Sequence, residues 1–144
     1  MIFAEEKQIK VRKGSAIFDS MLRFYENSPN DSEKAFIGLT FDDQNFICES
    51  DNLFRALQDL RRKLETVNIQ ILCNGAAKNV YPSPMLMGMG PCRKAFKLQC
   101  GRPAKMSDLI EIFDFDETLE FTDVDTQNAF YSHWVKSLQH CPPQ

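Results

Sequence analysis

Apolar side chains recur at different periods in successive segments of the chain, which predicts a mixture of strands and helices. Residues 35–41 and 44–49 are two β-prone runs joined by a pair of aspartates, a pattern typical of a hairpin with a tight polar turn. The next segment carries apolar residues at three- and four-residue spacing and predicts a helix capped by Ser50 or Asp51: Leu53, Phe54, Leu57, Leu60 and Leu64. Residues 67–73 return as a strand, so these segments together predict a ββαβ unit.

The segments before this unit differ in their periodicity. The chain up to Lys13 alternates between polar and apolar residues, which predicts an edge strand. Ser15 is a suitable N-cap for the apolar stripe that follows it, which is spaced as on one face of a helix: Ile17, Phe18, Met21, Leu22, Phe24 and Tyr25. We therefore expect a helix over residues 15–25 and a polar loop over residues 26–33.

The C-terminal half begins with residues 81–91, which are rich in proline, glycine and methionine and predict a long loop. Residues 94–99 alternate as a strand with one polar face, and residues 106–115 fit either a strand or a short helix. Asp125 can cap a final helix with an apolar stripe: Phe130, Tyr131, Trp134, Val135 and Leu138. The expected fold is α+β, a single domain over residues 1–144 with a mostly antiparallel sheet, the ββαβ unit and a C-terminal helix packed on it.

The composition is that of a soluble globular domain, with 144 residues, 43% hydrophobic and 26% charged side chains, and a formal net charge of -3. No apolar run approaches the roughly 18 to 20 residues that cross a bilayer, and the N-terminus lacks a basic region followed by an apolar stretch. We therefore expect a cytoplasmic protein without membrane contact. The slight excess of acids argues against nucleic acid as a direct ligand, because phosphate binding needs clustered positive charge.

The cysteines give no sign of a metal site. Five cysteines form an odd set without a CxxC pair, which argues against structural zinc. Cys48 and Cys73 lie in apolar runs and are expected in the core as reduced thiols. Cys92 and Cys141 are each next to a proline and are expected to be exposed. We expect no metal and no cofactor.

One short motif would suggest an enzyme in another context. Residues 112–119, an apolar run followed by Asp-x-Asp-x-Thr, resemble the first motif of haloacid-dehalogenase-type phosphatases, in which Asp114 would be the nucleophile and Asp116 the acid/base. That chemistry needs a doubly wound sheet after the motif and further residues to hold phosphate and magnesium. Only 26 residues follow Thr118 and they hold a single lysine, so we interpret the segment as non-catalytic.

The same segment lies in a strongly acidic block. Residues 108–125 hold eight carboxylates and no lysine or arginine, whereas residues 93–105 hold five bases and no acid. A local charge of about -8 can steer a basic partner, and the interleaved phenylalanines supply apolar anchors. The residues predicted to contact that partner are Asp114, Asp116, Glu117, Glu120, Asp123, Phe115 and Phe121. An acidic face that is merely solvated is the alternative interpretation.

A second feature that could contact a partner is the methionine-rich segment. Met85, Met87 and Met89 alternate with small residues, and methionine-rich surfaces adapt their shape to partners. The alternative function to partner binding through the acidic block is a small enzyme or ligand-binding domain. It would use the segment from Tyr81 to Cys92 as a lid over a pocket.

Several segments carry a family resemblance: residues 36–43, the predicted helix after them, Cys73-Asn74-Gly75, residues 79–83 and residues 93–98. Together they resemble small bacterial immunity proteins encoded beside polymorphic toxins, as in contact-dependent growth inhibition. The resemblance implies a cytosolic, non-enzymatic protein that binds and neutralises one toxin domain, often a nuclease. An acidic, aromatic surface fits that role independently, because a nuclease active site is basic. The oligomeric state is not predicted.

Overall fold

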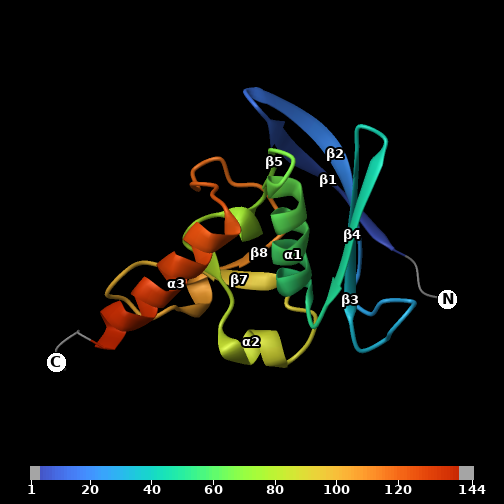
Figure 1. Ribbon diagram of the computed structural model, residues 1–144. Coiled ribbons are helices and arrows are strands. Elements are labelled where there is room, and N and C mark those ends of the chain that lie inside the picture. The colour runs from blue at the N-terminus through green and yellow to red at the C-terminus, as the bar shows by residue number, and fades with distance from the viewer. Residues whose placement is uncertain (1–3, 140–144) are drawn as a thin grey trace.

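The computed structural model describes residues 4–139, which form two antiparallel sheets connected and flanked by helices (Figure 1). The larger sheet has the strand order β4-β3-β2-β1-β5, with β1 (Glu5–Lys13), β2 (Ala16–Tyr25), β3 (Ala35–Phe41), β4 (Gln44–Ser50) and β5 (Ile69–Leu72). The smaller sheet has the order β6-β7-β8, with β6 (Val80–Tyr81), β7 (Lys94–Lys97) and β8 (Leu109–Glu111). The helices are α1 (Leu53–Glu65), α2 (Pro84–Gly88), α3 (Val124–Gln139) and the short 3-10 helices η1 (Asn74–Ala76) and η2 (Met106–Asp108).

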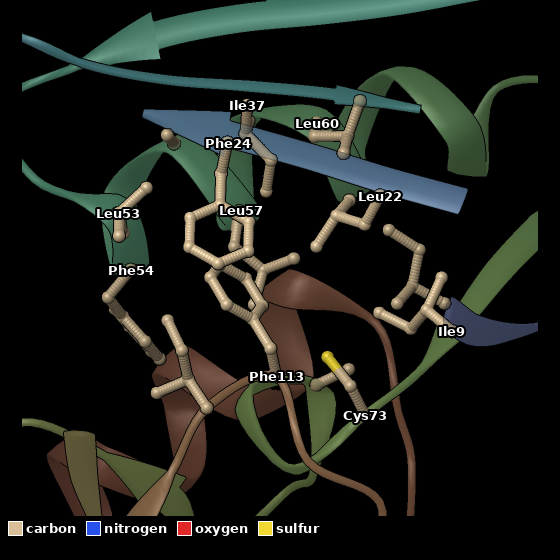
Figure 2. Packing of buried hydrophobic residues seen from close by; sticks show 14 of the residues in the cluster. Ile9, Leu22, Phe24, Ile37, Leu53, Phe54, Leu57, Leu60, Cys73 and Phe113 are labelled. Carbon is tan, nitrogen blue, oxygen red and sulfur yellow. The ribbon is translucent and has the colours of Figure 1, made fainter. Parts of the chain in front are cut away.

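Helix α1 occupies the centre of the molecule. It packs against β3, β4 and β5 of the larger sheet and also contacts η1 and α3. In Figure 1, α3 lies on the far side of α1 from β3 and β4. Figure 2 shows Phe24 of β2, Leu57 of α1 and Phe113 meeting in the core, with the rings of Phe24 and Phe113 4.6 Å apart. The predicted α+β class with a mostly antiparallel sheet is confirmed.

The predicted hairpin and the strand after the helix are confirmed as β3, β4 and β5. Asp42 and Asp43 join β3 to β4 with φ of 51° and 61°, the left-handed values that a two-residue hairpin turn requires. Aspartate visits this region more readily than most residues because its short side chain can hydrogen-bond locally. β5 pairs with β1, not with β3 or β4, so it extends the sheet at the opposite edge.

The helix predicted for residues 15–25 is wrong, because this segment is strand β2. Gly14, with φ of 63°, helps form the tight turn that folds β2 back onto β1. Pairing with both β1 and β3 outweighs the helical spacing of the apolar residues. Leu22 and Phe24 alternate into the core, whereas Ile17 stays exposed. The segment up to Lys13 is a strand as predicted, but it lies between β2 and β5 and is not an edge.

Helix α1 is confirmed, and the apolar residues predicted for its stripe are completely buried. Its cap is Asn52 rather than Ser50 or Asp51, because the Asn52 side chain accepts a hydrogen bond from the backbone N–H of Arg55 at 2.9 Å. Two polar residues of the helix, Gln58 and Arg61, are buried as well. The sequence pattern gave no indication of this.

The segment 81–91 is not one long loop. After β6 the Ser83 hydroxyl accepts a hydrogen bond from the N–H of Leu86 at 3.1 Å, and α2 begins at Pro84. Proline suits a first helical turn because its missing N–H would be unsatisfied there in any case. Residues 106–115, for which strand and helix both remained open, contain the short helix η2 followed by strand β8.

The predicted strand at 94–99 is confirmed as β7, and the C-terminal helix is confirmed as α3. The cap of α3 is Asp123 rather than Asp125, since the Asp123 side chain accepts from the N–H of Thr126 at 2.7 Å. Asp125 lies in the first turn, where its charge faces the positive end of the helix dipole. Among residues 4–139, no helix is long and apolar enough to cross a membrane.

The cysteines follow the predictions in part. Cys48 and Cys73 are buried with free thiols, as expected. Cys92 is also buried, which contradicts the expected exposure. The carbonyl of Pro91 accepts a hydrogen bond from the N–H of Leu53 at 2.7 Å, which fixes this turn against the start of α1. Cys141 lies outside the described residues.

Candidate partner-binding surface

Residues 112–123, called the acidic loop below, connect β8 to α3 and are held at both ends by backbone hydrogen bonds, while the Leu119 N–H donates to the Asp116 carbonyl within the loop at 3.1 Å. Four of these bonds join the loop to residues 74–78: Asn74 N–H to Asp114 O (2.7 Å), Gly75 N–H to Ile112 O (2.8 Å), Lys78 N–H to Glu120 O (2.8 Å) and Thr122 N–H to Ala76 O (3.1 Å). A loop fixed in this way loses little conformational freedom when a partner binds. The loop is therefore preorganised.

Gly75 allows the acidic loop to approach the core this closely. A Cβ atom at residue 75 would lie 2.7 Å from Cδ2 of Leu57 and 3.0 Å from Cβ of Ile112, which is closer than carbon atoms pack. The loop therefore lies directly against η1 and α1 because residue 75 has no side chain.

A buried polar network holds the end of the acidic loop where α3 begins. Arg61 of α1, only 2% exposed, donates to the side-chain oxygen of Gln127 and to the carbonyl of Thr122, both at 2.6 Å. Gln127 in turn donates to the carbonyls of Gly75, Ala77 and Val80 at 2.8 to 3.0 Å. Burial lowers the pKa of Arg61. Sequence reasoning missed this network because its partners are remote in the chain.

The phenylalanines of the acidic loop divide between the core and the surface. Phe113 is buried against Phe24. Phe115 is 44% exposed and stacks on Phe121, with ring centroids 5.7 Å apart. The Nζ atom of Lys10 lies 5.8 Å from the Phe115 centroid, within cation–π range. The structure thus brings together the two predicted aromatic site residues, Phe115 and Phe121.

Half of the eight carboxylates between residues 108 and 125 form ion pairs with bases from other segments. These pairs are Asp114 with Lys7, Glu120 with Lys78 (3.7 Å), Asp125 with Arg62 (2.9 Å) and Glu111 with Arg93 (4.0 Å). The local negative charge is therefore about half of what the sequence block alone suggests. The sequence could not show this, because every one of these bases lies outside the block.

Asp116 and Glu117 are the carboxylates of the loop that stay available to a partner. Asp116 accepts hydrogen bonds from the backbone N–H of Thr118 at 2.9 Å and from its hydroxyl at 2.6 Å. These bonds lower the pKa of Asp116, so the group is charged at neutral pH. Glu117 is exposed beside it. Asp123, by contrast, uses its carboxylate to cap α3, and the hydrogen bonds from Thr126 lower its pKa.

Basic side chains of β1 lie beside the acidic loop. Lys7 and Lys10 line a hollow of about 490 Å³ together with Phe115. Arg12 lines a second hollow, of about 550 Å³, together with Phe121. The bases of β1 were visible in the sequence, but nothing there placed them beside the acidic loop. The surface therefore combines the acids and aromatic rings of the loop with bases of one neighbouring strand, an arrangement that can discriminate between partners.

Metal ligands and nucleophiles were sought among the candidate groups of the described residues. In the range 4–139, no group of three or more His, Cys, Asp or Glu side chains is arranged to hold a metal ion. Burial raises the pKa of the Cys73 thiol and of the Cys92 thiol to about 11, so neither is a thiolate nucleophile at neutral pH. His133 is exposed on α3. No protein-family model matches the chain, and no curated protein matches it.

Proposed function

We propose that this protein is a non-enzymatic, cytoplasmic immunity protein that binds and neutralises a basic bacterial toxin domain through the acidic loop. The observation that carries the proposal is the preorganised loop, which presents exposed Phe115 beside the unpaired charges of Asp116 and Glu117. Rigid aromatic anchors with adjacent charges are the residues that dominate binding energy at protein interfaces. The sequence resemblance to immunity proteins supports the class of partner.

The loop's carboxylates have different roles in this proposal. Asp116 lies next to an aromatic ring and is held in position by Thr118, so it can meet a Lys or Arg of the partner at a fixed position. Asp114 was predicted for the same role, but it already pairs with Lys7, and a partner has to displace or share that pair. Glu117 and Glu120 at the rim set association rate and specificity more than affinity.

The first test is whether a gene beside this one encodes a toxin domain, and its absence would count against the proposal. The decisive experiment is then a calorimetric titration of that domain with Asp116→Ala, paired with a melting curve. We expect binding to weaken at least tenfold, about 1.4 kcal/mol, without a change in melting temperature. Glu33→Ala, an exposed acid outside the loop, is the matched control and should bind like the parent. If Asp116→Ala and Asp114→Ala both bind like the parent, the loop is a solvated face and the proposal fails.

The charge of the loop also predicts a kinetic signature. Association with the toxin domain should slow as salt rises, because charges farther apart than a Debye length of about 8 Å are screened at physiological ionic strength. The dissociation rate should change less. An association rate that stays flat from low to high salt would contradict steering by the acidic loop.

A third measurement separates this proposal from the phosphatase interpretation of the same motif. Asp114 is paired with Lys7 and Asp116 is bonded to Thr118, so neither carboxylate is positioned against a phosphate site. We expect no magnesium-dependent hydrolysis of a generic phosphomonoester. Turnover that disappears in Asp114→Asn would overturn the non-enzymatic assignment.

A further inference from the structure

The larger sheet has two edges, and they are protected differently. β5, at one edge, has only four residues, and the chain directly after it is hydrogen-bonded to the acidic loop. β4, at the other edge, has seven residues (Figure 1). An edge strand presents unpaired N–H and C=O groups that can pair with a strand of another chain. The longer edge therefore needs a means of protection.

Alternate residues of β4 direct their backbone groups away from β3. Phe41 and Gln44 are partners on either side of the two-residue turn, and a turn of this kind is closed by a hydrogen-bonded pair. Hydrogen-bonded and non-hydrogen-bonded pairs alternate along an antiparallel ladder, so Asn45 and Ile47 belong to non-hydrogen-bonded pairs. Their N–H and C=O groups therefore face the open edge.

The first five residues of β4, 44–48, lack the residues that usually protect an edge. They include no charged residue, no proline and no glycine, and the side chain of Ile47 is 53% exposed. The first charge of the strand is Glu49, whose carboxylate accepts a hydrogen bond from the hydroxyl of Ser28. Uncharged, β-prone segments without proline pair readily with copies of themselves. Protection of this edge has to come from another element.

Lys63 of α1 reaches the open edge of β4. Its Nζ donates to the carbonyl oxygen of Ile47 at 2.8 Å. A hollow of about 420 Å³ lies beside this contact, and Glu49 and Asp59 line it together with Lys63. Within residues 4–139, Lys63 forms no ion pair with either carboxylate. The ammonium group thus occupies a backbone acceptor of the strand although two acids lie nearby.

We infer that Lys63 closes the β4 edge, and that the strand it excludes is β4 of a second copy of this chain. A pairing strand lies about 4.8 Å away and bonds to the edge-facing carbonyls, so the Lys63 ammonium has to leave Ile47 before pairing. Two identical edges pair antiparallel about a two-fold axis, so a second copy needs no other matching feature. The inference goes beyond the proposed function, because the acidic loop lies at the opposite edge of the sheet.

The test compares the self-association of the parent and of Lys63→Met by analytical ultracentrifugation over a range of protein concentrations. Methionine keeps an unbranched apolar side chain but has no donor for the Ile47 carbonyl. We expect Lys63→Met to self-associate at least about tenfold more tightly than the parent. Lys63→Arg keeps a donor, and Arg62→Met removes the neighbouring charge of α1. Both are controls that should behave like the parent.

Two further measurements assign the association to β4. Amide hydrogen exchange at Asn45 and Ile47 should slow in Lys63→Met, because their N–H groups become paired. Adding Ile47→Lys to Lys63→Met should restore the behaviour of the parent, because it places a charge on the strand itself. Ile47 and Lys63 are both exposed, so the fold tolerates these changes.

Four outcomes would overturn the inference. Lys63→Met may associate no more tightly than the parent, its association may leave exchange at Asn45 and Ile47 unchanged, or it may persist when Ile47→Lys is added. A parent that already self-associates with slow exchange at these amides is the fourth, because its edge would be open despite Lys63. None of these results bears on the acidic loop, which is tested by Asp116→Ala.

Discussion

Helices α1 and α3 have similar apolar stripes in the sequence, but the structure uses them differently. Eight of the 13 residues of α1 are buried, whereas only Val124 and Gln127 are buried among the 16 residues of α3. α1 packs against β3, β4 and β5 and is covered on other sides by η1 and α3. α3 touches α1 and β6, and its residues Trp134 and Leu138 line an apolar hollow together with residues of α2 and β7. An apolar stripe therefore does not by itself distinguish a core helix from a helix that presents a surface.

α3 is also attached to the rest of the protein by interactions different from those of α1. The hydrogen bonds of Gln127 fix its start, and aromatic stacking fixes its next turns. The ring centroid of Tyr131 lies 4.1 Å from that of Tyr81 and 5.9 Å from that of Trp134. Polar bonds and a few stacked rings hold the helix in place without burying its stripe. Trp134 and Leu138 therefore remain in the lining of the apolar hollow. We therefore expect α1 to contribute more to fold stability than the C-terminal half of α3.

The largest predicted effect tests this division directly. Leu57→Ala should lower the free energy of unfolding by about 2 to 5 kcal/mol, because it opens a cavity in a fully packed site. Leu138→Ala, the matched variant in α3, should cost less than about 1 kcal/mol, since its side chain is only partly buried. Urea unfolding of both variants measures the difference. Equal losses would mean that α3 belongs to the core after all.

How well the sequence predicted each element depends on how far apart in the sequence the residues that stabilise it lie. The β3–β4 hairpin, α1 and α3 were predicted because turn residues and periodicity are local signals, although the cap predicted for each helix was wrong. β2 was mistaken for a helix because its pairing with β1 and β3 is decided by tertiary contacts. The ion pair of Asp114 with Lys7 spans most of the chain, and no local pattern reports it.

The candidate site was also predicted only as far as local sequence patterns reach. The sequence placed acids and phenylalanines in one segment, and the structure keeps Phe115, Phe121 and Asp116 on one loop. It could not tell which phenylalanine is buried, since Phe113 and Phe115 both adjoin Asp114 in the same acidic block. The sequence singled out the methionine-rich segment, but not the apolar hollow of about 910 Å³ that this segment lines together with residues of β7, η2 and α3.

The second prediction concerns the bond between the two helices. Arg61→Met should cost about 1 to 3 kcal/mol, because the buried oxygens of Gln127 and Thr122 lose a donor. Combining it with Gln127→Met should give a coupling energy of about 0.5 to 3 kcal/mol in a double-mutant cycle. Denaturant unfolding of the four proteins provides the data. Additive losses would show that the two helices are stabilised independently.

The third prediction uses pH. The Cys73 and Cys92 thiols have pKa values of about 11 in the folded protein, against 9.0 when unperturbed. Between these pH values the unfolded state binds fewer protons than the folded state, so the free energy of unfolding falls as pH rises. The variant Cys73→Ala/Cys92→Ala should show a shallower decline from pH 9.0 to about 11 than the parent. Cys100→Ser, at an exposed thiol, is the control and should leave the slope unchanged.

The smallest expected effect is at an exposed contact between α1 and α3, where Arg62 and Asp125 form an ion pair of 2.9 Å. Both side chains are largely exposed, so water screens their attraction and holding them together costs rotamer entropy. Asp125→Asn should therefore change the free energy of unfolding by only about 0.2 to 1 kcal/mol, and the change should shrink as salt rises. The measurement is denaturant unfolding of parent and variant at low and high salt. A loss as large as that of Arg61→Met would show that α3 is held by surface charge as much as by its buried polar contacts, and the contrast between the two attachments would disappear.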